Sequence, residues 1–265
     1  MNVEIGKANL HLGDCAEVLK KLSDESIDLT ITSPPYDNLR TYNGFVFDFE
    51  SIAKELFRVT KQGGVVVWVV GDATVDGSET GTSFKQALYF KEIGFNLHDT
   101  MIWEKPNFSN PSTNRYHQIF EYMFVLSKGK PKTFNPIMDV KNKYGTCLGK
   151  NTKRQANGDL IEVKKNEGRE YGMRRNIWKL NTVGQEMMCE TPPHPAMFPE
   201  RLVYEHLVSW SNEDDIVLDP FLGSGTTGIV STQHNRKFIG SEISDEYFDI
   251  ACKRIEDAQR QVCLF

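Results

Sequence analysis

The sequence contains few cysteines and no long apolar run, and these absences exclude several classes of protein. Its 265 residues include 5 cysteines, an odd number with no CxxC pair, so neither a disulfide framework nor a zinc knuckle is indicated and we predict reduced thiols. No apolar run approaches the roughly 20 residues of a membrane span, and the first residues lack the apolar core of a signal peptide. We therefore expect a soluble, cytoplasmic protein without membrane contact or a metal site.

The charge that is present is unevenly distributed. The formal net charge is −5, which as a whole-chain number argues weakly against a polyanionic partner such as nucleic acid. The segment Lys128–Glu190, however, holds fourteen Lys and Arg against seven Asp and Glu, a net of +7, which leaves 17 basic and 29 acidic residues elsewhere, a net of −12. The acidity therefore belongs to the rest of the chain, and the basic segment suits a polyanion.

Short β-branched runs alternate with amphipathic stretches of helical length, which predicts an α/β fold with a mostly parallel, doubly wound sheet. The expected strands are Ala8–Leu12, Ile27–Thr32, Val65–Val70, Leu97–Trp103, Ile119–Leu126, Ile216–Leu218 and Lys237–Glu242. The expected helices are Cys15–Leu22, Phe49–Thr60, Ser83–Ile93, Pro199–Trp210, Thr226–His234 and Asp245–Gln259. We expect Gly63-Gly64 to act as the C-terminal stop of the second of these helices.

The segment Lys128–Glu190 breaks this rhythm. It is rich in Lys, Asn and Gly and has only short apolar runs, which is typical of an inserted subdomain or a long functional loop. We therefore expect residues 1–127 and 191–265 to form one sheet domain, with residues 128–190 inserted into it.

A glycine-rich turn lies between a predicted strand and a predicted helix. Gly223, Gly225 and Gly228 match GxGxxG, and Glu242 follows Asp219 by 23 residues at the end of the next strand, where it can accept hydrogen bonds from ribose hydroxyls. The pattern predicts an adenosine-containing cofactor. A strand-to-helix turn without a ligand is one alternative. A nicotinamide or flavin dinucleotide is another, although the carboxylate and ring that precede the glycines would stand where its pyrophosphate packs.

A second turn combines two prolines with a hydroxyl and an aromatic ring. Ser33-Pro34-Pro35-Tyr36 follows the predicted strand Ile27–Thr32, and each proline restricts its own φ and the residue before it. At the carboxyl end of a parallel strand, the Ser33 hydroxyl, the backbone carbonyls and the Tyr36 face would form a rigid platform for a planar ring with an amino group. Alone, this turn is equally compatible with a proline-rich surface loop.

Together, the Thr32–Tyr36 and Asp219–Thr227 motifs resemble those of the amino-group DNA methyltransferases that use S-adenosyl-L-methionine. The catalytic motif precedes the cofactor loop, as in the beta, circularly permuted class. The resemblance implies a Rossmann-like methyltransferase fold, with the basic segment as the target-recognition region. It also assigns the catalytic role to Ser33, Pro34, Pro35 and Tyr36, and cofactor binding to Asp14, Cys15, Phe198, Asp219, Pro220, Phe221, Gly223, Ser224, Gly225, Thr226 and Glu242.

In this family the target base leaves the duplex and enters the pocket, because its amino group cannot be reached inside the stack. The resemblance then implies that Tyr36 stacks on the base, while Ser33 Oγ and the Pro34 carbonyl orient the amino group for direct methyl transfer. Carbon-5 cytosine methylation is excluded, because it needs a thiolate after a proline and none of the five cysteines follows one. Serine at position 33 favours cytosine, giving N(4)-methylcytosine, over adenine, giving N(6)-methyladenine, and leaves both open.

The expected partner is double-stranded DNA. The basic side chains of Lys164, Lys165, Arg174 and Arg175 lie near Tyr171 and Trp178, which favours phosphate contact and groove reading over a merely solvated face. The resemblance also allows a homodimer and a separately encoded cognate restriction endonuclease. A non-catalytic DNA-binding subunit and a dinucleotide-dependent oxidoreductase remain the alternatives from other classes.

Overall fold

The computed structural model describes residues 1–35, 47–108, 111, 113–142, 152–162, 170–182 and 199–262. It divides into two compact units, one formed by Met1–Asn135 with Asn176–Phe265 and the other by Pro136–Arg175. The larger unit carries the sheet and its helices, and each unit is described by itself.

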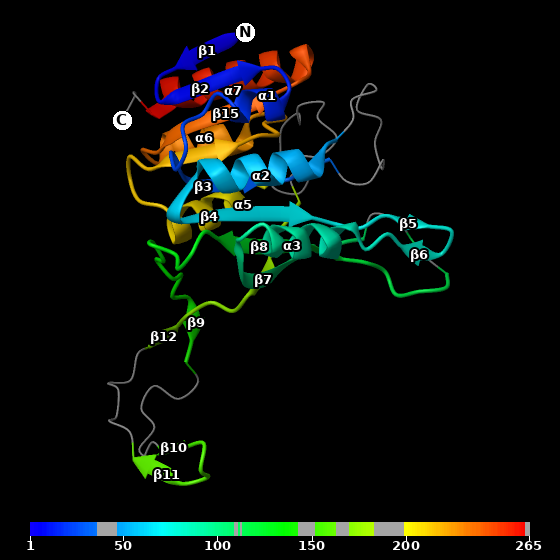
Figure 1. The fold of residues 1–265 in the computed structure, drawn as a ribbon, viewed down its shortest axis with the longest axis vertical. Helices are drawn as coiled ribbons and strands as arrows, with labels where there is room; N and C mark the ends of the chain where they lie inside the picture. Colours follow the sequence, from blue (N-terminus) through cyan, green and yellow to red (C-terminus); the bar gives the residue numbers. More distant parts are fainter. Residues whose placement is uncertain are drawn as a thin grey trace. The chain divides into compact units, whose positions relative to one another are not determined.

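The larger unit is built on a nine-stranded sheet of mostly parallel strands (Figure 1). From edge to edge the order is β1 (Asn2–Ile5), β2 (Ala8–Leu12), β15 (Lys237–Glu242), β14 (Ile216–Asp219), β3 (Ile27–Thr32), β4 (Thr60–Val70), β8 (Phe120–Ser127), β7 (Asn96–Glu104) and β13 (Ile177–Lys179). Only β1 and β8 run antiparallel to their neighbours in this sheet, among the residues that the structure describes.

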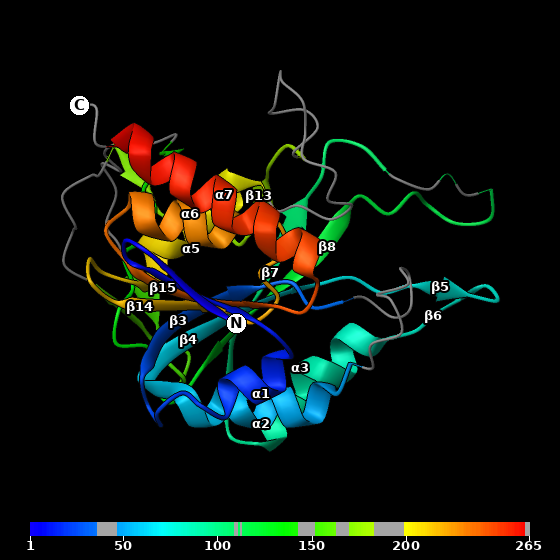
Figure 2. The same cartoon turned by 90° about the horizontal axis from the view of Figure 1, so that it is seen from above.

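Helices cover both faces of the sheet (Figure 2). One face carries α1 (Cys15–Leu19), α2 (Phe49–Val59) and α3 (Thr82–Glu92), and the other carries α5 (Glu200–Trp210), α6 (Thr226–Gln233) and α7 (Asp245–Val262). Because helices cover both faces, β3 and the second half of β4 are almost continuously buried, with Ile31 and Val67 completely buried. The predicted doubly wound α/β fold is confirmed.

Most expected elements lie within a few residues of their predicted bounds, and three strands (β2, β3 and β15) have the predicted limits. The role given to Gly63-Gly64 is wrong. Helix α2 ends at Val59, where the Thr60 hydroxyl caps Leu56 O at 2.6 Å, and β4 then runs through the glycines. Gly63 has φ +79° and donates its N–H to Lys128 O at 2.7 Å. The glycine pair therefore permits a close approach to the backbone at Lys128 and does not end a helix.

Several short strands escaped the sequence patterns. The edge strand β13 lies within the predicted insertion, yet it pairs in parallel with β7. The chain therefore returns to the larger unit at Asn176. The compact smaller unit is therefore shorter than the predicted segment at both ends. The other short strands form two-stranded pairs, namely β5 (Thr74–Val75) with β6 (Ser78–Glu79), β9 (Val140–Lys141) with β12 (Tyr171–Gly172), and β10 (Thr152–Arg154) with β11 (Leu160–Glu162).

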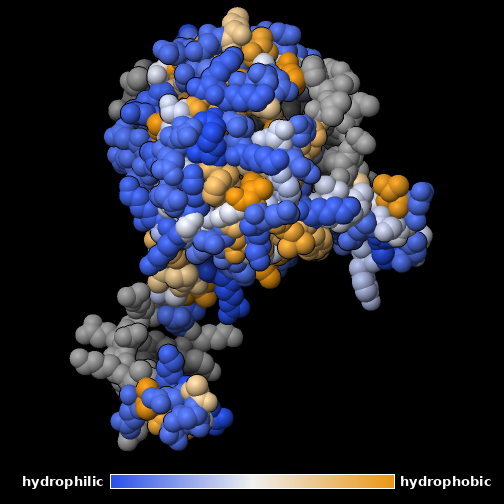
Figure 3. Space-filling view, viewed as in Figure 1, coloured by the Kyte–Doolittle hydropathy of each residue, from blue (hydrophilic) through white to orange (hydrophobic). Residues whose placement is uncertain are grey.

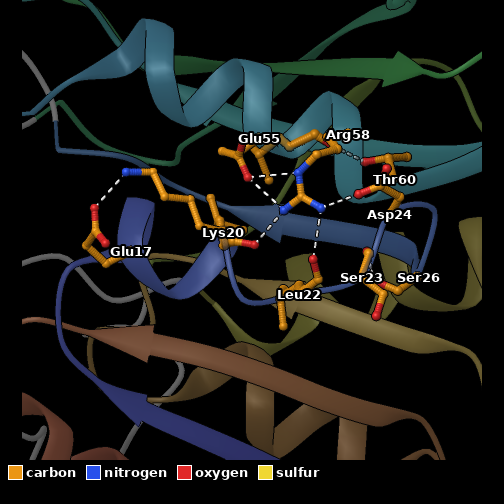
Figure 4. A network of polar contacts seen from close by, with 11 residues as sticks. Glu17, Lys20, Leu22, Ser23, Asp24, Ser26, Glu55, Arg58 and Thr60 are labelled. Carbon is orange, nitrogen blue, oxygen red and sulfur yellow. Dashed lines mark hydrogen bonds and ion pairs between the residues drawn. The ribbon is translucent and has the colours of Figure 1, made fainter.

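A polar cluster around Arg58 joins α2 to the connection between α1 and β3 (Figure 4). Its guanidinium donates hydrogen bonds to Leu19 O at 2.8 Å and Leu22 O at 2.9 Å, and it also pairs with the carboxylates of Asp24 and Glu55. Leu19 is the last residue of α1 and Leu22 lies three residues beyond it, so Arg58 supplies extra donors to carbonyls at the end of this short helix. Arg58 therefore fixes the approach of the chain to β3, the strand that leads to the Ser33 turn.

In the part of the chain that the structure describes, no helix combines the length and apolar character needed to cross a membrane.

Candidate functional site

Strands β3 and β14 lie side by side in parallel at the centre of the sheet. From β3 the chain continues through α2 to β4 on one side, whereas from β14 it continues through α6 to β15 on the other side. The two helices cover opposite faces, so the connections diverge at this point (Figure 2). Such a switch point opens a crevice at the carboxyl ends of the strands, where α/β proteins bind their ligands. Both sequence motifs begin there, at Thr32 and Asp219.

The two motifs are joined by a buried carboxylate. Asp219, the last residue of β14, is 2% exposed. Its Oδ1 accepts a hydrogen bond from Thr32 Oγ1 at 2.6 Å and from the Phe221 N–H at 3.1 Å, and its Oδ2 accepts one from Thr227 Oγ1 at 2.7 Å. Because Thr32 immediately precedes Ser33, this carboxylate links the proline turn to the glycine-rich loop.

Burial shapes the electrostatics of this carboxylate. Removal from water disfavours the charged form and raises the pKa of Asp219 to about 6, although the hydrogen bonds from Thr32, Thr227 and Phe221 oppose the shift. The group is therefore mostly ionised at neutral pH, and the two threonine hydroxyls and one backbone N–H stabilise its charge. Because Asp219 is only 2% exposed and accepts three hydrogen bonds from the protein, it organises the site from inside the fold.

Glycine is required at each of the three loop positions for a different structural reason. Gly223 and Gly225 have φ of +54° and +84°, in the left-handed region that only glycine adopts readily. Gly228 lies inside α6, where an added Cβ would come within 2.6 Å of Ile255 Cδ1 and 2.8 Å of Phe238 Cε1. The first two glycines therefore shape the turn, and the third permits close packing of α6 on α7 and β15.

The other predicted residues of this loop lie around the same turn. Pro220 is buried, and its carbonyl accepts a hydrogen bond from Ser241 Oγ at 2.9 Å, while Thr226 is buried at the start of α6. Phe221 is half-buried, with its ring edge-on to Trp68 at a centroid distance of 6.2 Å. Arg254 of α7 reaches back to hold buried Ser224, donating to its carbonyl at 2.6 Å and to its hydroxyl at 3.0 Å.

Glu242 ends β15, the strand next to β14. Its Oε2 accepts a hydrogen bond from the Gly223 N–H at 2.8 Å, and its Oε1 accepts from the N–H groups of Ile243 at 3.0 Å and Ser244 at 2.9 Å. Partial burial raises the pKa of Glu242, and the three N–H donors oppose that shift. The carboxylate is thus held against the glycine-rich loop, at the edge of the sheet where it was predicted.

Residues that follow β2 also lie at this carboxyl edge of the sheet. The Gly13 N–H donates to Glu242 O at 2.8 Å, which ties the two strand ends together. Asp14 is exposed and caps α1, because its carboxylate accepts from the N–H groups of Ala16 at 2.8 Å and Glu17 at 3.2 Å. Burial and the neighbouring Asp14 carboxylate raise the pKa of Cys15 to about 12, so its thiol stays neutral.

The catalytic turn is described only as far as its second proline. Ser33 and Pro35 are half-buried and Pro34 is buried, directly after the last residue of β3. Four predicted site residues lie outside the described ranges, namely Tyr36, Lys164, Lys165 and Phe198.

The remaining two predicted DNA contacts belong to the smaller unit. Arg174 is largely buried there, and its Nε donates to Asp139 Oδ2 at 2.8 Å, so its charge is already neutralised within the protein. Arg175 is exposed. Of these two side chains, Arg175 is the better placed to meet a phosphate.

Thr32, Thr227 and Arg254 hold the site together, and none of them was predicted as a site residue from the sequence. The threonines had a detectable signal, since one begins and the other ends the two motifs. Arg254 had none, because it is far from the loop in sequence. Asp72, two residues after the end of β4, accepts a hydrogen bond at 2.9 Å from the N–H of Ser83 in the first turn of α3.

Comparison with known proteins places this architecture among DNA-modifying enzymes. A family model described as DNA methylase, for N6 and N4 methyltransferases, matches residues 27–253. The orphan methyltransferase M.BamHII of Bacillus amyloliquefaciens is 56% identical over 243 residues, which cover 90% of this chain and 92% of that protein. The DNA adenine methyltransferase YhdJ of Escherichia coli is 29% identical over 252 residues, which cover 93% and 82%.

A solved structure matches the fold. The putative DNA modification methylase TTHA0409 of Thermus thermophilus, in complex with S-adenosyl-L-methionine, superposes with a TM-score of 0.64 and 24% identity. The superposition covers 97% of this chain and 95% of that one.

Proposed function

This chain belongs to the N6/N4 DNA methylase family, and we propose that it transfers the methyl group of S-adenosyl-L-methionine to the N4 amino group of cytosine within a specific DNA sequence. The observation that carries the proposal is the buried hydrogen bond between Thr32 and Asp219. It holds the Ser33 turn and the glycine-rich loop at neighbouring strand ends, where a base and a cofactor would meet. The order of the two motifs along the chain supports the beta class.

The residues at this edge fit the adenosine part of the cofactor. A carboxylate has about four acceptor positions, and three backbone N–H groups take two on Glu242 Oε1 and one on Oε2. One position on Oε2 thus remains for a ribose hydroxyl. Asp14 and Cys15 would border the adenine, whereas Asp219 would act indirectly by fixing the loop. The relative from Thermus thermophilus whose structure contains this cofactor supports the assignment.

When bound, S-adenosyl-L-methionine would supply an electrophilic methyl group. The exocyclic amino nitrogen is a poor nucleophile because its lone pair is delocalised into the ring. Hydrogen bonds from that amino group to Ser33 Oγ and to the Pro34 carbonyl would favour a tetrahedral nitrogen and direct its lone pair. The two prolines stiffen this turn, so positioning and preorganised electrostatics would provide most of the acceleration.

The choice of cytosine rests on the residue at position 33. A neutral serine hydroxyl stands where the adenine enzymes of the resembling family usually carry Asp or Asn. The similarity to an adenine methyltransferase supports the second candidate, N(6)-methyladenine, by the same mechanism. The same site could form either product, so identifying the methylated base distinguishes the two candidate functions.

The smaller unit, Pro136–Arg175, would read the target sequence on double-stranded DNA. By sequence it holds ten basic and five acidic residues. Phosphate contacts release counterions, so DNA affinity should fall steeply as salt rises, and deleting this unit should flatten that dependence. We place the enzyme in the cytoplasm, acting with a separately encoded restriction endonuclease or alone, and a homodimer is compatible with either setting.

The test of the proposal is labelled methyl transfer to duplex DNA followed by base analysis. We expect N(4)-methylcytosine, whereas N(6)-methyladenine would replace the cytosine assignment and label found only on RNA or protein would overturn the function. Ser33→Ala should lose turnover and keep cofactor affinity, measured by calorimetry. Ser23→Ala is the matched control, because Ser23 is exposed at the opposite end of β3. Equal loss of turnover and cofactor affinity in Ser33→Ala would remove its specific catalytic role.

A further inference from the structure

The carboxyl edge of the sheet carries two projections beyond the catalytic turn. One is the β5–β6 hairpin, which follows β4, and the other is the loop formed by residues 105–108, 111 and 113–119, the described part of the connection between β7 and β8. Both extend on the same side of the larger unit in both views (Figures 1 and 2). Strand β4 is the direct neighbour of β3, and Trp68 of β4 lies opposite Thr32. The projections therefore rise from the same edge as Ser33.

The two projections are bonded to each other. The hairpin turns through Asp76 and Gly77, which have φ of +49° and +81°, as in a two-residue turn with two left-handed residues. Arg115 ties the loop to it, donating to Gly77 O at 2.6 Å and to Thr74 Oγ1 at 3.3 Å.

Ring packing within the loop adds to this anchoring. The Phe108 and His117 rings pack with centroids 3.9 Å apart, which joins the two halves of the loop. At the base of the loop, Lys105 N donates to Ile119 O at 2.6 Å.

Between the anchored residues Arg115 and His117 lies a tyrosine whose side chain is not packed against the fold. Tyr116 is 100% exposed, whereas Phe108 in the same loop is 43% exposed. Much of the surface in view is hydrophilic, with apolar side chains over α3 and on the β5–β6 hairpin (Figure 3). The Tyr116 ring buries no surface in the folded protein and stays fully hydrated, so its apolar face is available to a ligand with a flat apolar face.

The cations of the loop already have partners inside the protein. Arg115 is bound to the hairpin, and Lys105 pairs with Glu121 of β8. The loop is therefore suited to contact through its aromatic ring more than through charge. Nucleobases are the aromatic partners that a methyltransferase of DNA meets at this edge, and they stack on tyrosine irrespective of sequence.

We propose that the Arg115–His117 part of the connection between β7 and β8 contacts DNA beside the flipped base, with the Tyr116 ring stacked on an unpaired or partly unstacked nucleobase. This inference rests on the proposed function. Stacking of this kind would offset part of the cost of unstacking the target nucleotide. Because the loop is anchored before binding, little conformational freedom would be lost on contact.

The experiment compares Tyr116→Ala, Tyr116→Phe and the control Tyr204→Ala. Tyr204 is 41% exposed and packs against His234, beyond the end of α6, near the amino end of β15 and away from the catalytic edge. The probe is duplex DNA that carries the sequence found methylated in expressing cells. Tyr116→Ala should bind this DNA about fivefold to a hundredfold more weakly, since base stacking on an aromatic side chain has that magnitude. Tyr116→Phe and Tyr204→Ala should stay within about twofold of the wild type.

Salt dependence separates stacking from charge. The loss in Tyr116→Ala should be the same factor at low and physiological salt, because no phosphate contact is removed. The inference is overturned if Tyr116→Ala binds like the wild type, if its loss varies with salt, or if Tyr116→Phe is equally weak. Affinity for S-adenosyl-L-methionine should not change in any variant. If the wild type itself neither binds nor methylates duplex DNA, the proposed function fails instead.

Discussion

Replacing the buried Asp219 carboxylate by an amide should change how stability depends on pH. In Asp219→Asn the amide oxygen can accept from Thr32 and Phe221, while the amide nitrogen can donate to the Thr227 hydroxyl. The network therefore survives without its charge. At pH 7.5 we expect the variant to be at least as stable as the wild type.

The magnitude follows from the pKa of Asp219. Burial raises it from 3.8 to about 6 in the folded protein, so the folded state keeps the proton to a higher pH than the unfolded chain. The stability that this group contributes is complete below pH 3.8 and is lost as pH rises through about 6. At about 1.4 kcal/mol per pKa unit, the total is about 3 kcal/mol, of which about 2 kcal/mol falls between pH 4.5 and 7.5.

Urea unfolding at pH 4.5 and 7.5, followed by circular dichroism, measures this difference. Groups common to both proteins cancel, so the free energy of unfolding of Asp219→Asn relative to the wild type should rise by about 2 kcal/mol between the two pH values. The control Asp249→Asn, at an exposed position of α7, should show no such change. An equal stability difference at both pH values for Asp219→Asn would refute the assignment of the shift to this carboxylate.

Three further predictions follow from the described contacts. Arg58→Met should lower the free energy of unfolding by about 2 kcal/mol, because it removes hydrogen bonds to two carbonyls and two carboxylates; an unchanged urea midpoint would contradict this. Gly228→Ala should cost about 1–3 kcal/mol by overpacking against Ile255 and Phe238, and calorimetry of the folded variant should still give wild-type cofactor affinity. The Cys15 thiol, with its pKa raised to about 12 by burial, should react with iodoacetamide at pH 8 at least about a hundredfold more slowly than free cysteine, as followed by peptide mass spectrometry; alkylation at the rate of free cysteine would show that the thiol is not held in its neutral form.

The fold class and both motifs could be predicted from local sequence patterns alone. Apolar runs bounded by turn residues are local signals, so β2, β3 and β15 could be located to the residue. The glycine-rich loop was also readable, because the left-handed conformations at Gly223 and Gly225 are a local requirement of the turn. The division of charge between an acidic body and a basic segment needed no coordinates.

Which residues contact one another could not be predicted from the sequence and is known only from the folded chain. Strand order placed Thr32 beside Asp219, 187 positions away along the chain, and made a buried carboxylate the link between the two motifs. Pairing with a distant strand also places β13 in the main sheet and Gly63 against the backbone at Lys128, because such pairing overrides the local sequence pattern. The exposure of Tyr116 was likewise invisible in the sequence, since whether a ring is covered depends on everything folded around it.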